Sequence, residues 1–183
     1  MLDLSSLPRE SEQKIPPVHL WKPDFCGDID MLIKANGEWI HEGQPIRRPA
    51  MVRMFSRILW YEAGKYFLVT PVEKVGIKVE DAPFLVNTYE TKIGDDGLCY
   101  FEFITSTEDR LTLGGNSQRL WVENSSVQPR PYISARYGMK ALLSRSVYYD
   151  LVEQGSTREI NGKLHHCIHS GNAFFSLGVL EEE

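Results

Sequence analysis

Four arginines gather between residues 43 and 61, in a stretch that contains neither aspartate nor glutamate. These are Arg47, Arg48, Arg53 and Arg57. Guanidinium groups form paired hydrogen bonds to carboxylates and phosphates, so this stretch has the composition of an anion-binding site. A second acid-free stretch, 124–149, contains Arg130, Arg136, Lys140 and Arg145. Because the chain has 25 acidic residues and a net charge of −5, this segregation predicts a local positive field.

The first basic stretch is predicted to contain a helix. Its apolar residues recur at the spacing of a single helix face: Met51, Val52, Phe55, Ile58 and Leu59. Pro49 suits the first helical turn, and it should hold Arg48 extended just outside the helix start. Unpaired N–H groups and the positive end of the helix dipole attract anions there. Arg47 and Arg48 therefore form a candidate phosphate or carboxylate site. The alternative is that they are solvated residues of an outer face, and their spacing does not decide between the two.

The second basic stretch is also predicted to be helical. The expected buried stripe consists of Met139, Leu142, Leu143, Val147 and Leu151. Gly155 is a plausible stop for this helix.

Three further patterns suggest chemistry, and each has a simpler structural interpretation. The sequence "HHCIH" (165–169) resembles a metal motif, but a single strand cannot wrap its ligands around zinc, so an ordinary strand is favoured. Asp28 and Asp30 could hold magnesium for a hydrolase, or they could be turn and strand residues. Glu73 and Lys74 are candidate polar contacts for a ligand, and Asp81 before Ala82-Pro83 is a candidate ligand contact or a turn cap.

These residues must be positioned by a mixture of hairpins and helices. Asn36-Gly37 predicts a hairpin, "VGIKV" (75–79) alternates as a strand, and Gly94–Gly97 predicts a turn between two strand-forming runs. Gly114-Gly115 is predicted to lie in a further hairpin turn. Antiparallel strands with one helix in each half indicate an α+β fold.

Part of this pattern occurs twice. Ser56-Arg57 recurs as Ser144-Arg145, Trp39 as Trp121, and Gly64-Lys65 as Gly162-Lys163. The growing offsets predict a duplicated unit of hairpin, basic helix and returning strands, with longer connections in the second copy. We expect an N-terminal segment (1–20), an N-terminal domain (21–84) and a C-terminal domain (85–183).

The overall composition limits the function classes. With a pI near 5.6 the chain is not expected to bind nucleic acid generally, and no run reaches the roughly 20 apolar residues of a membrane helix. Three scattered cysteines and no secretory signal predict a cytoplasmic protein. No catalytic triad, phosphate-binding loop or dinucleotide fingerprint occurs, so neither an enzymatic activity nor a cofactor or metal is predicted.

The sequence resembles an uncharacterised bacterial family, the domain of unknown function family 1285. The resemblance rests on Trp21-x-Pro23, Cys26-Gly27-Asp28-Ile29, Gly37-x-Trp39, Gly43-x-Pro45-Ile46-x-Arg48, Leu68–Lys74, Ile77-x-Val79-x-Asp81-Ala82-Pro83-Phe84 and a closing "AFFSLG". It implies a duplicated two-part fold whose second half is pleckstrin-homology-like. It also implies a site between the halves for a nucleotide-like ligand, and a role in signal transduction.

The first hypothesis is therefore a ligand-binding or regulatory protein that holds an anionic small molecule, plausibly a nucleotide, between its halves. Arg47 and Arg48 would supply charge, Glu73, Lys74 and Asp81 polar contacts, and Trp39 a stacking face. The second hypothesis is a module that docks an acidic protein partner. The third is a hydrolase that uses Asp28 and Asp30 with a metal ion.

Overall fold

The computed structural model describes residues 15–114, 118–124 and 128–180, with only the backbone of Asn124. The chain divides between Pro83 and Phe84 into two compact units. Among the described residues, no helix is both long and apolar enough to span a bilayer.

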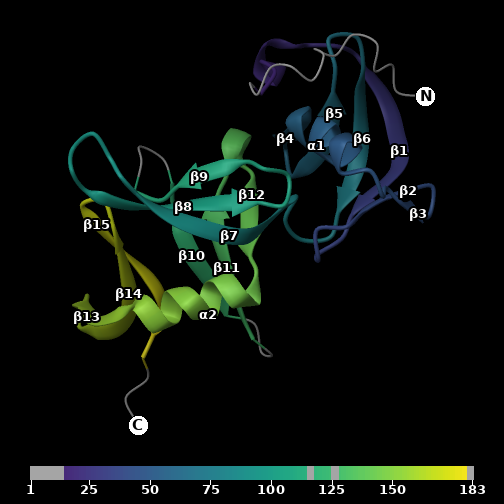
Figure 1. The fold of residues 1–183 in the computed structure, drawn as a ribbon. Coiled ribbons are helices and arrows are strands. Elements are labelled where there is room, and N and C mark those ends of the chain that lie inside the picture. The colour runs from purple at the N-terminus through teal and green to yellow at the C-terminus, as the bar shows by residue number, and fades with distance from the viewer. Residues whose placement is uncertain (1–14, 115–117, 125–127, 181–183) are drawn as a thin grey trace. The chain divides into compact units, whose positions relative to one another are not determined.

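The N-terminal unit is a mixed six-stranded sheet with one α-helix (Figure 1). Its elements are η1 (Val18–Leu20), β1 (Phe25–Ile33), β2 (Trp39–His41), β3 (Gln44–Pro45), α1 (Pro49–Arg57), β4 (Leu59–Glu62), β5 (Lys65–Val69) and β6 (Lys74–Val79). The strand order is β3-β2-β1-β6-β5-β4. Two antiparallel meanders meet at its centre, where β1 and β6 run parallel.

The two faces of this sheet differ because side chains alternate along each strand. One face carries Leu59, Leu68 and Val75, which are at most 5% exposed. Trp39 also belongs to the buried core, and its ring stacks on Phe55 of α1 with centroids 6.3 Å apart. The opposite face carries the larger polar and aromatic side chains described below.

The C-terminal unit repeats this sheet order. It contains β7 (Phe84–Ile93), β8 (Cys99–Thr105), β9 (Arg110–Thr112), β10 (Leu120–Asn124), β11 (Pro129–Ser134), η2 (Arg136–Gly138), β12 (Lys140–Leu143), α2 (Arg145–Gln154), β13 (Ser156–Ile160), β14 (Lys163–Ser170) and β15 (Ala173–Val179). Its six-stranded sheet has the order β10-β11-β12-β7-β8-β9, again with a parallel central pair, β12 and β7. Both six-stranded sheets are therefore mixed, and the expectation of antiparallel sheets was wrong at their parallel central pairs.

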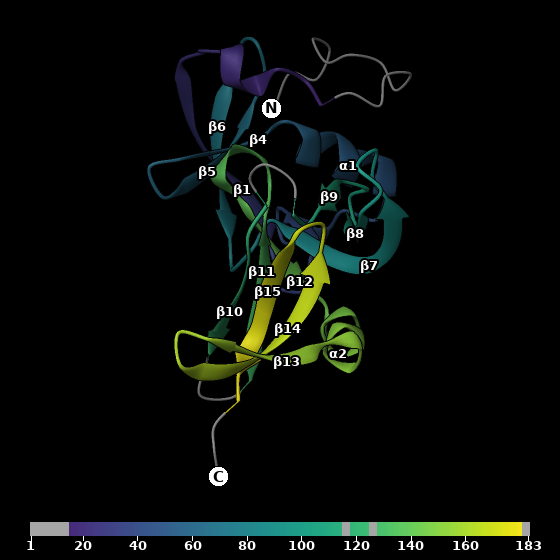
Figure 2. The ribbon, with the colours of Figure 1, turned by 90° about the vertical axis from the view of Figure 1, so that its left-hand side faces the viewer.

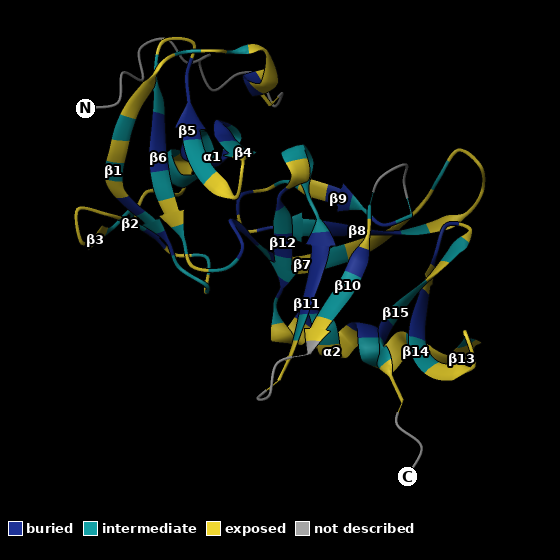
Figure 3. Ribbon diagram, turned by 180° about the vertical axis from the view of Figure 1, so that it is seen from behind, coloured by how far each residue is buried: buried dark blue, intermediate teal, exposed yellow. Residues whose placement is uncertain are grey.

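The last three strands form a separate antiparallel sheet beside α2 (Figure 2). Strands β11 and β14 each contain three buried residues, whereas β13 contains none and is almost entirely exposed (Figure 3). The fold is thus α+β with an internal duplication, because each unit contains a six-stranded sheet in which two antiparallel meanders meet at a parallel central pair. The pleckstrin-homology-like character of this unit stays a prediction.

Several local predictions are confirmed. Gly37 has a φ of 84° in the turn between β1 and β2, and Gly97 has a φ of 77° in the turn between β7 and β8. Pro49 begins α1, and Arg48 precedes it in extended conformation with φ −92° and ψ 111°. The sequence "HHCIH" lies on strand β14.

Other local predictions were wrong. The second helix begins at Arg145, and Met139, Leu142 and Leu143 lie before it, at or within β12. Buried residues nevertheless occur on both sides of that junction, at Ala141 and Leu143 in β12 and at Val147 and Leu151 in α2. Gly114 does not belong to a hairpin, since β9 and β10 are the opposite edges of their sheet, and Gly115 lies outside the described residues. Ser56 lies near the end of α1 whereas Ser144 caps the start of α2, so the duplicated elements do not align at those residues.

Candidate functional site

Arg47 and Arg48 lie at the start of α1, and both side chains are exposed. Neither forms an ion pair with a described residue. No side chain caps this helix start, where Pro49 has no N–H and the N–H groups of Met51 and Val52 donate to the Arg48 carbonyl oxygen. The first basic stretch therefore keeps its positive charge at the helix entrance.

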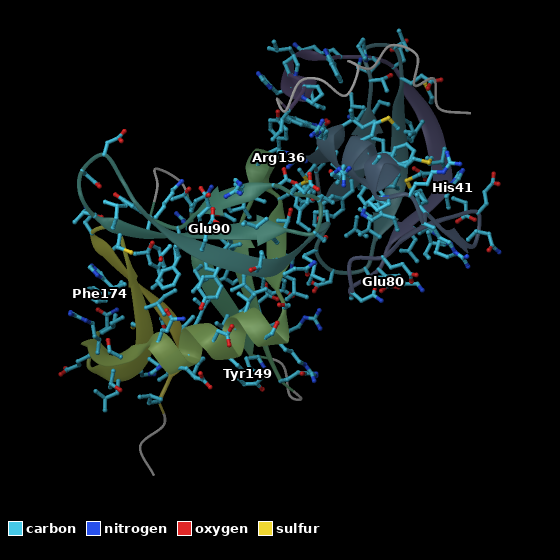
Figure 4. The ribbon with its side chains drawn as sticks, in the orientation of Figure 1. His41, Glu80, Glu90, Arg136, Tyr149 and Phe174 are labelled. Carbon is cyan, nitrogen blue, oxygen red and sulfur yellow. The ribbon has the colours of Figure 1, made fainter. Side chains whose placement is uncertain are left out.

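Two cations of the second basic stretch, Arg136 and Lys140, pair with acids from outside it. Arg136, labelled in Figure 4, forms an ion pair with Asp109 and lies over the Phe84 ring, 4.6 Å from its centroid. Lys140 Nζ lies 3.8 Å from Glu123 Oε1. These two ion pairs weaken the positive field expected for the second basic stretch.

The six predicted ligand-binding residues separate into two groups along β6. Lys74 begins this strand and Asp81 follows its end, and since a strand advances about 3.3 Å per residue, they lie roughly 20 Å apart. Trp39 lies at the far end with Asp81, because it pairs with Ile33, which in turn neighbours Val79.

Arg47 and Arg48 follow directly after Ile46, whose N–H donates to the Trp39 carbonyl, so they also belong to that far end. Glu73 and Lys74 belong to the other end. Trp39 is 2% exposed in the core and presents no stacking face to a ligand. The prediction of a ligand between the two halves stays a prediction.

The remaining candidates do not assemble a metal site. Asp28 projects over Gly76 on the neighbouring strand, where an added Cβ would lie 1.9 Å from its Oδ1. The Asp30 carbonyl oxygen lies 3.1 Å from Nδ1 of His41, which is labelled in Figure 4. Across residues 15–114, 118–124 and 128–180, no three His, Cys, Asp or Glu side chains are grouped as metal ligands would be.

Instead, a pocket of about 400 Å³ opens on the face of the N-terminal sheet that lies opposite to Leu59, Leu68 and Val75. Its apolar walls are Val18, Trp21, Pro23, Trp60 and Val69. Its polar lining consists of His19, Lys22, Glu62 and Lys74. The strand register explains this arrangement, because it places Trp60, Glu62, Val69 and Lys74 on one face of β4, β5 and β6. The segment around η1 supplies the remaining wall.

The polar part of the pocket is an ordered cluster. Lys74 Nζ donates to Glu62 Oε2 at 2.6 Å, and Trp60 Nε1 donates to the same oxygen at 3.2 Å. Lys74 Nζ also lies over the Phe67 ring, 4.3 Å from its centroid. The hydrogen bonds from Lys74 and Trp60, with the lysine's charge, lower the pKa of Glu62. Two lysines and one glutamate give the lining a charge of about +1 with neutral histidine.

Chemically, the pocket combines two indole rings with a net positive rim. Indole faces stack on planar rings, while ammonium groups bind carboxylates and phosphates. The volume of about 400 Å³ lies near the lower end of the range of about 300–1,000 Å³ for small-molecule pockets.

Both units match known family models. Residues 16–82 match the N-terminal domain of DUF1285, described as a domain of unknown function, and residues 83–177 match the C-terminal domain of the same family. The chain belongs to the DUF1285 family. The resemblance seen in the sequence is thereby confirmed.

Two solved DUF1285 structures are similar to this chain. One, from Silicibacter pomeroyi DSS-3, is 40% identical with a TM-score of 0.79, over 92% of this chain and 90% of the other. The second, from Shewanella baltica OS155, is 27% identical with a TM-score of 0.54, over 67% of this chain and 90% of the other. No curated protein matches the chain.

Of the pocket residues, the sequence singled out only Lys74 as a ligand contact. Trp21 and Pro23 were noted as part of the DUF1285 resemblance but received no role. Trp60 and Glu62 were missed, although their alternation in "LWYE" places them on one strand face. Their meeting with Lys74 depends on the pairing of β4, β5 and β6, which no local pattern specifies.

Proposed function

We propose that the N-terminal unit of this DUF1285 protein binds a small anionic molecule with a planar ring, such as a mononucleotide, in the pocket between η1 and β4–β6. The observation that carries the proposal is the convergence of Trp21, Trp60 and Lys74 on one pocket of suitable size. In this arrangement Trp21 stacks on the ring, and Lys22 and Lys74 attract the anionic group.

Calorimetric titration with AMP, GMP, CMP and UMP tests this proposal. Base–aromatic stacking contributes about 1–3 kcal/mol, so Trp21→Ala should weaken binding about fivefold or more. Lys74→Met should weaken it about tenfold through loss of a charge-assisted hydrogen bond.

Lys34→Met is the matched control, because Lys34 forms a comparable exposed ion pair with Glu38 at 2.8 Å but does not line the pocket. We expect wild-type affinity from this variant. The proposal would be contradicted if the wild-type protein bound none of the four mononucleotides, or if Lys34→Met and Lys74→Met weakened mononucleotide binding equally.

A second candidate function is the docking of an acidic protein partner on Arg47 and Arg48. It is supported by the exposure of both arginines and by the lack of a side-chain cap at the helix start beside them. The probe is a fluorescent poly-glutamate peptide followed by anisotropy. The double variant Arg47→Glu/Arg48→Glu should abolish salt-sensitive binding, whereas Arg145→Glu at the start of α2 should leave it unchanged. Equal effects of the two changes would reject docking at α1.

A further inference from the structure

A single carboxylate oxygen occupies the point where two donors of the pocket converge. Glu62 Oε2 accepts a hydrogen bond from Lys74 Nζ at 2.6 Å and another from Trp60 Nε1 at 3.2 Å. These donors come from different strands, β6 and β4, so their convergence is set by strand pairing. Such a pair of donors forms a binding position for one oxygen of an oxyanion.

The donors are held more firmly than the acceptor. The Lys74 side chain is 20% exposed and lies against the Phe67 ring, whereas the Glu62 side chain is 55% exposed at the end of edge strand β4. An ion pair with an exposed partner stabilises a structure only weakly, because water solvates the carboxylate nearly as well. Glu62 can therefore rotate into solvent while Lys74 and Trp60 stay in place.

We infer that Glu62 is a built-in competitor that fills the oxyanion position of the pocket until a ligand carboxylate or phosphate displaces it. The inference rests on the proposed function, since it describes how the same pocket receives the anionic group of its ligand. Glu62 then lowers the affinity of the pocket for anions, because each anion must displace the Glu62 carboxylate and bind close to its negative charge.

Removal of the Glu62 carboxylate should consequently strengthen anion binding. We expect Glu62→Ala to lower the dissociation constant for a simple oxyanion about tenfold, by removing both the competing ion pair and a nearby like charge. Glu62→Gln should have a smaller effect, because its neutral amide oxygen still accepts hydrogen bonds from the same donors.

Asp28→Ala is the matched control. Asp28 is exposed on the same face of the sheet, opposite Gly76, but it neither lines the pocket nor bonds to Lys74. Its removal deletes one negative charge without vacating the oxyanion position. We therefore expect at most about a twofold change from long-range electrostatics.

The experiment is a titration of ¹⁵N-labelled protein with sodium acetate, and separately with sodium phosphate, at constant ionic strength maintained with chloride. The readout is the indole N–H signal of Trp60, assigned with Trp60→Phe. We expect a saturable shift that is about tenfold tighter in Glu62→Ala than in the wild type. The acetate and phosphate arms reveal which oxyanion the position prefers.

Equal dissociation constants in the wild type, Glu62→Ala and Asp28→Ala would overturn the inference, as would a Trp60 signal that does not respond to either anion in Glu62→Ala. The failure of the proposed function looks different. If mononucleotide binding depends on Trp21 but does not change in Glu62→Ala, the proposed function is supported and the role of Glu62 as a competitor is rejected. If acetate binds saturably at Trp60 but no mononucleotide binds, the role of Glu62 as a competitor is supported and the proposed ligand class is rejected.

Discussion

Gly155, the residue after α2, lies where an added methyl group has no room. An ideal Cβ at this position would lie 2.3 Å from Nε2 and 2.7 Å from Cδ2 of His166, and 3.1 Å from the Cys167 carbonyl oxygen. His166 cannot simply rotate away, because its Nε2 donates to the Val152 carbonyl oxygen at 2.6 Å and so joins β14 to the end of α2. Gly155→Ala should therefore displace the ring and break this hydrogen bond.

The magnitude follows from three terms. Overpacking costs about 1–3 kcal/mol, and the lost hydrogen bond about 1 kcal/mol. Because φ is −72° and ψ is 167°, alanine adopts this backbone without strain, and its smaller unfolded-state entropy returns about 0.5 kcal/mol. We expect Gly155→Ala to lower the free energy of unfolding by about 2–3 kcal/mol.

Urea denaturation followed by fluorescence measures this change. Gly178→Ala is the control, because nothing lies within 4 Å of its ideal Cβ and its φ is not in the left-handed region. It should change the stability by less than about 0.5 kcal/mol. In a His166→Ala background the Gly155→Ala substitution should lose most of its effect. If Gly155→Ala had the same free energy of unfolding as Gly178→Ala, the close packing of α2 against β14 would be refuted.

Three further predictions concern the two sheets. Burial alone would raise the pKa of Glu102, but hydrogen bonds from Lys92 and Arg110 lower it to about 2. The ionised Glu102 therefore stabilises the folded protein fully above about pH 4.5, and this contribution is lost as the pH falls toward 2. Glu102→Gln should therefore flatten the acid limb of a stability–pH profile and cost about 1–2 kcal/mol at pH 7, since both partners are half exposed. Burial, aided by the nearby Tyr61 and Asp81, raises the pKa of Tyr66 to about 12, so ultraviolet titration should find at least one phenol that ionises late, and stability should decline from about pH 10 upward. Trp39→Ala should cost about 3–5 kcal/mol in urea denaturation, which an exposed ligand-stacking residue would not.

Local signals in the sequence predicted the hairpins and the first helix. Gly37 and Gly97 adopt positive φ in turns that join paired strands, and such turn chemistry depends on only a few adjacent residues. Pro49 fixed the start of α1 for the same local reason. The second helix was misplaced because buried residues continue from β12 into α2, and one window cannot distinguish a strand followed by a helix from a longer helix.

The pocket could not have been predicted from spacing. Trp60, Glu62 and Lys74 converge because β5 lies between β4 and β6, and that order is a property of the whole sheet. Trp39 illustrates the converse, because a tryptophan beside a hairpin turn suggested a stacking face while its packing against Phe55 makes it part of the core. The charge segregation was real in composition, but Asp109 and Glu123, which both precede the second basic stretch, compensate part of it.

The central claim is that the pocket of the N-terminal unit receives an anionic, ring-containing ligand, and the four tryptophans of the chain test it directly. In ¹⁵N-labelled protein titrated with a mononucleotide, the indole signals of Trp21 and Trp60 should shift together and saturate, because both rings line the pocket. The signals of Trp39, in the core, and Trp121, in the C-terminal unit, should stay in place. Shifts confined to Trp39 or Trp121, or four unmoved signals across the mononucleotides, would contradict the account.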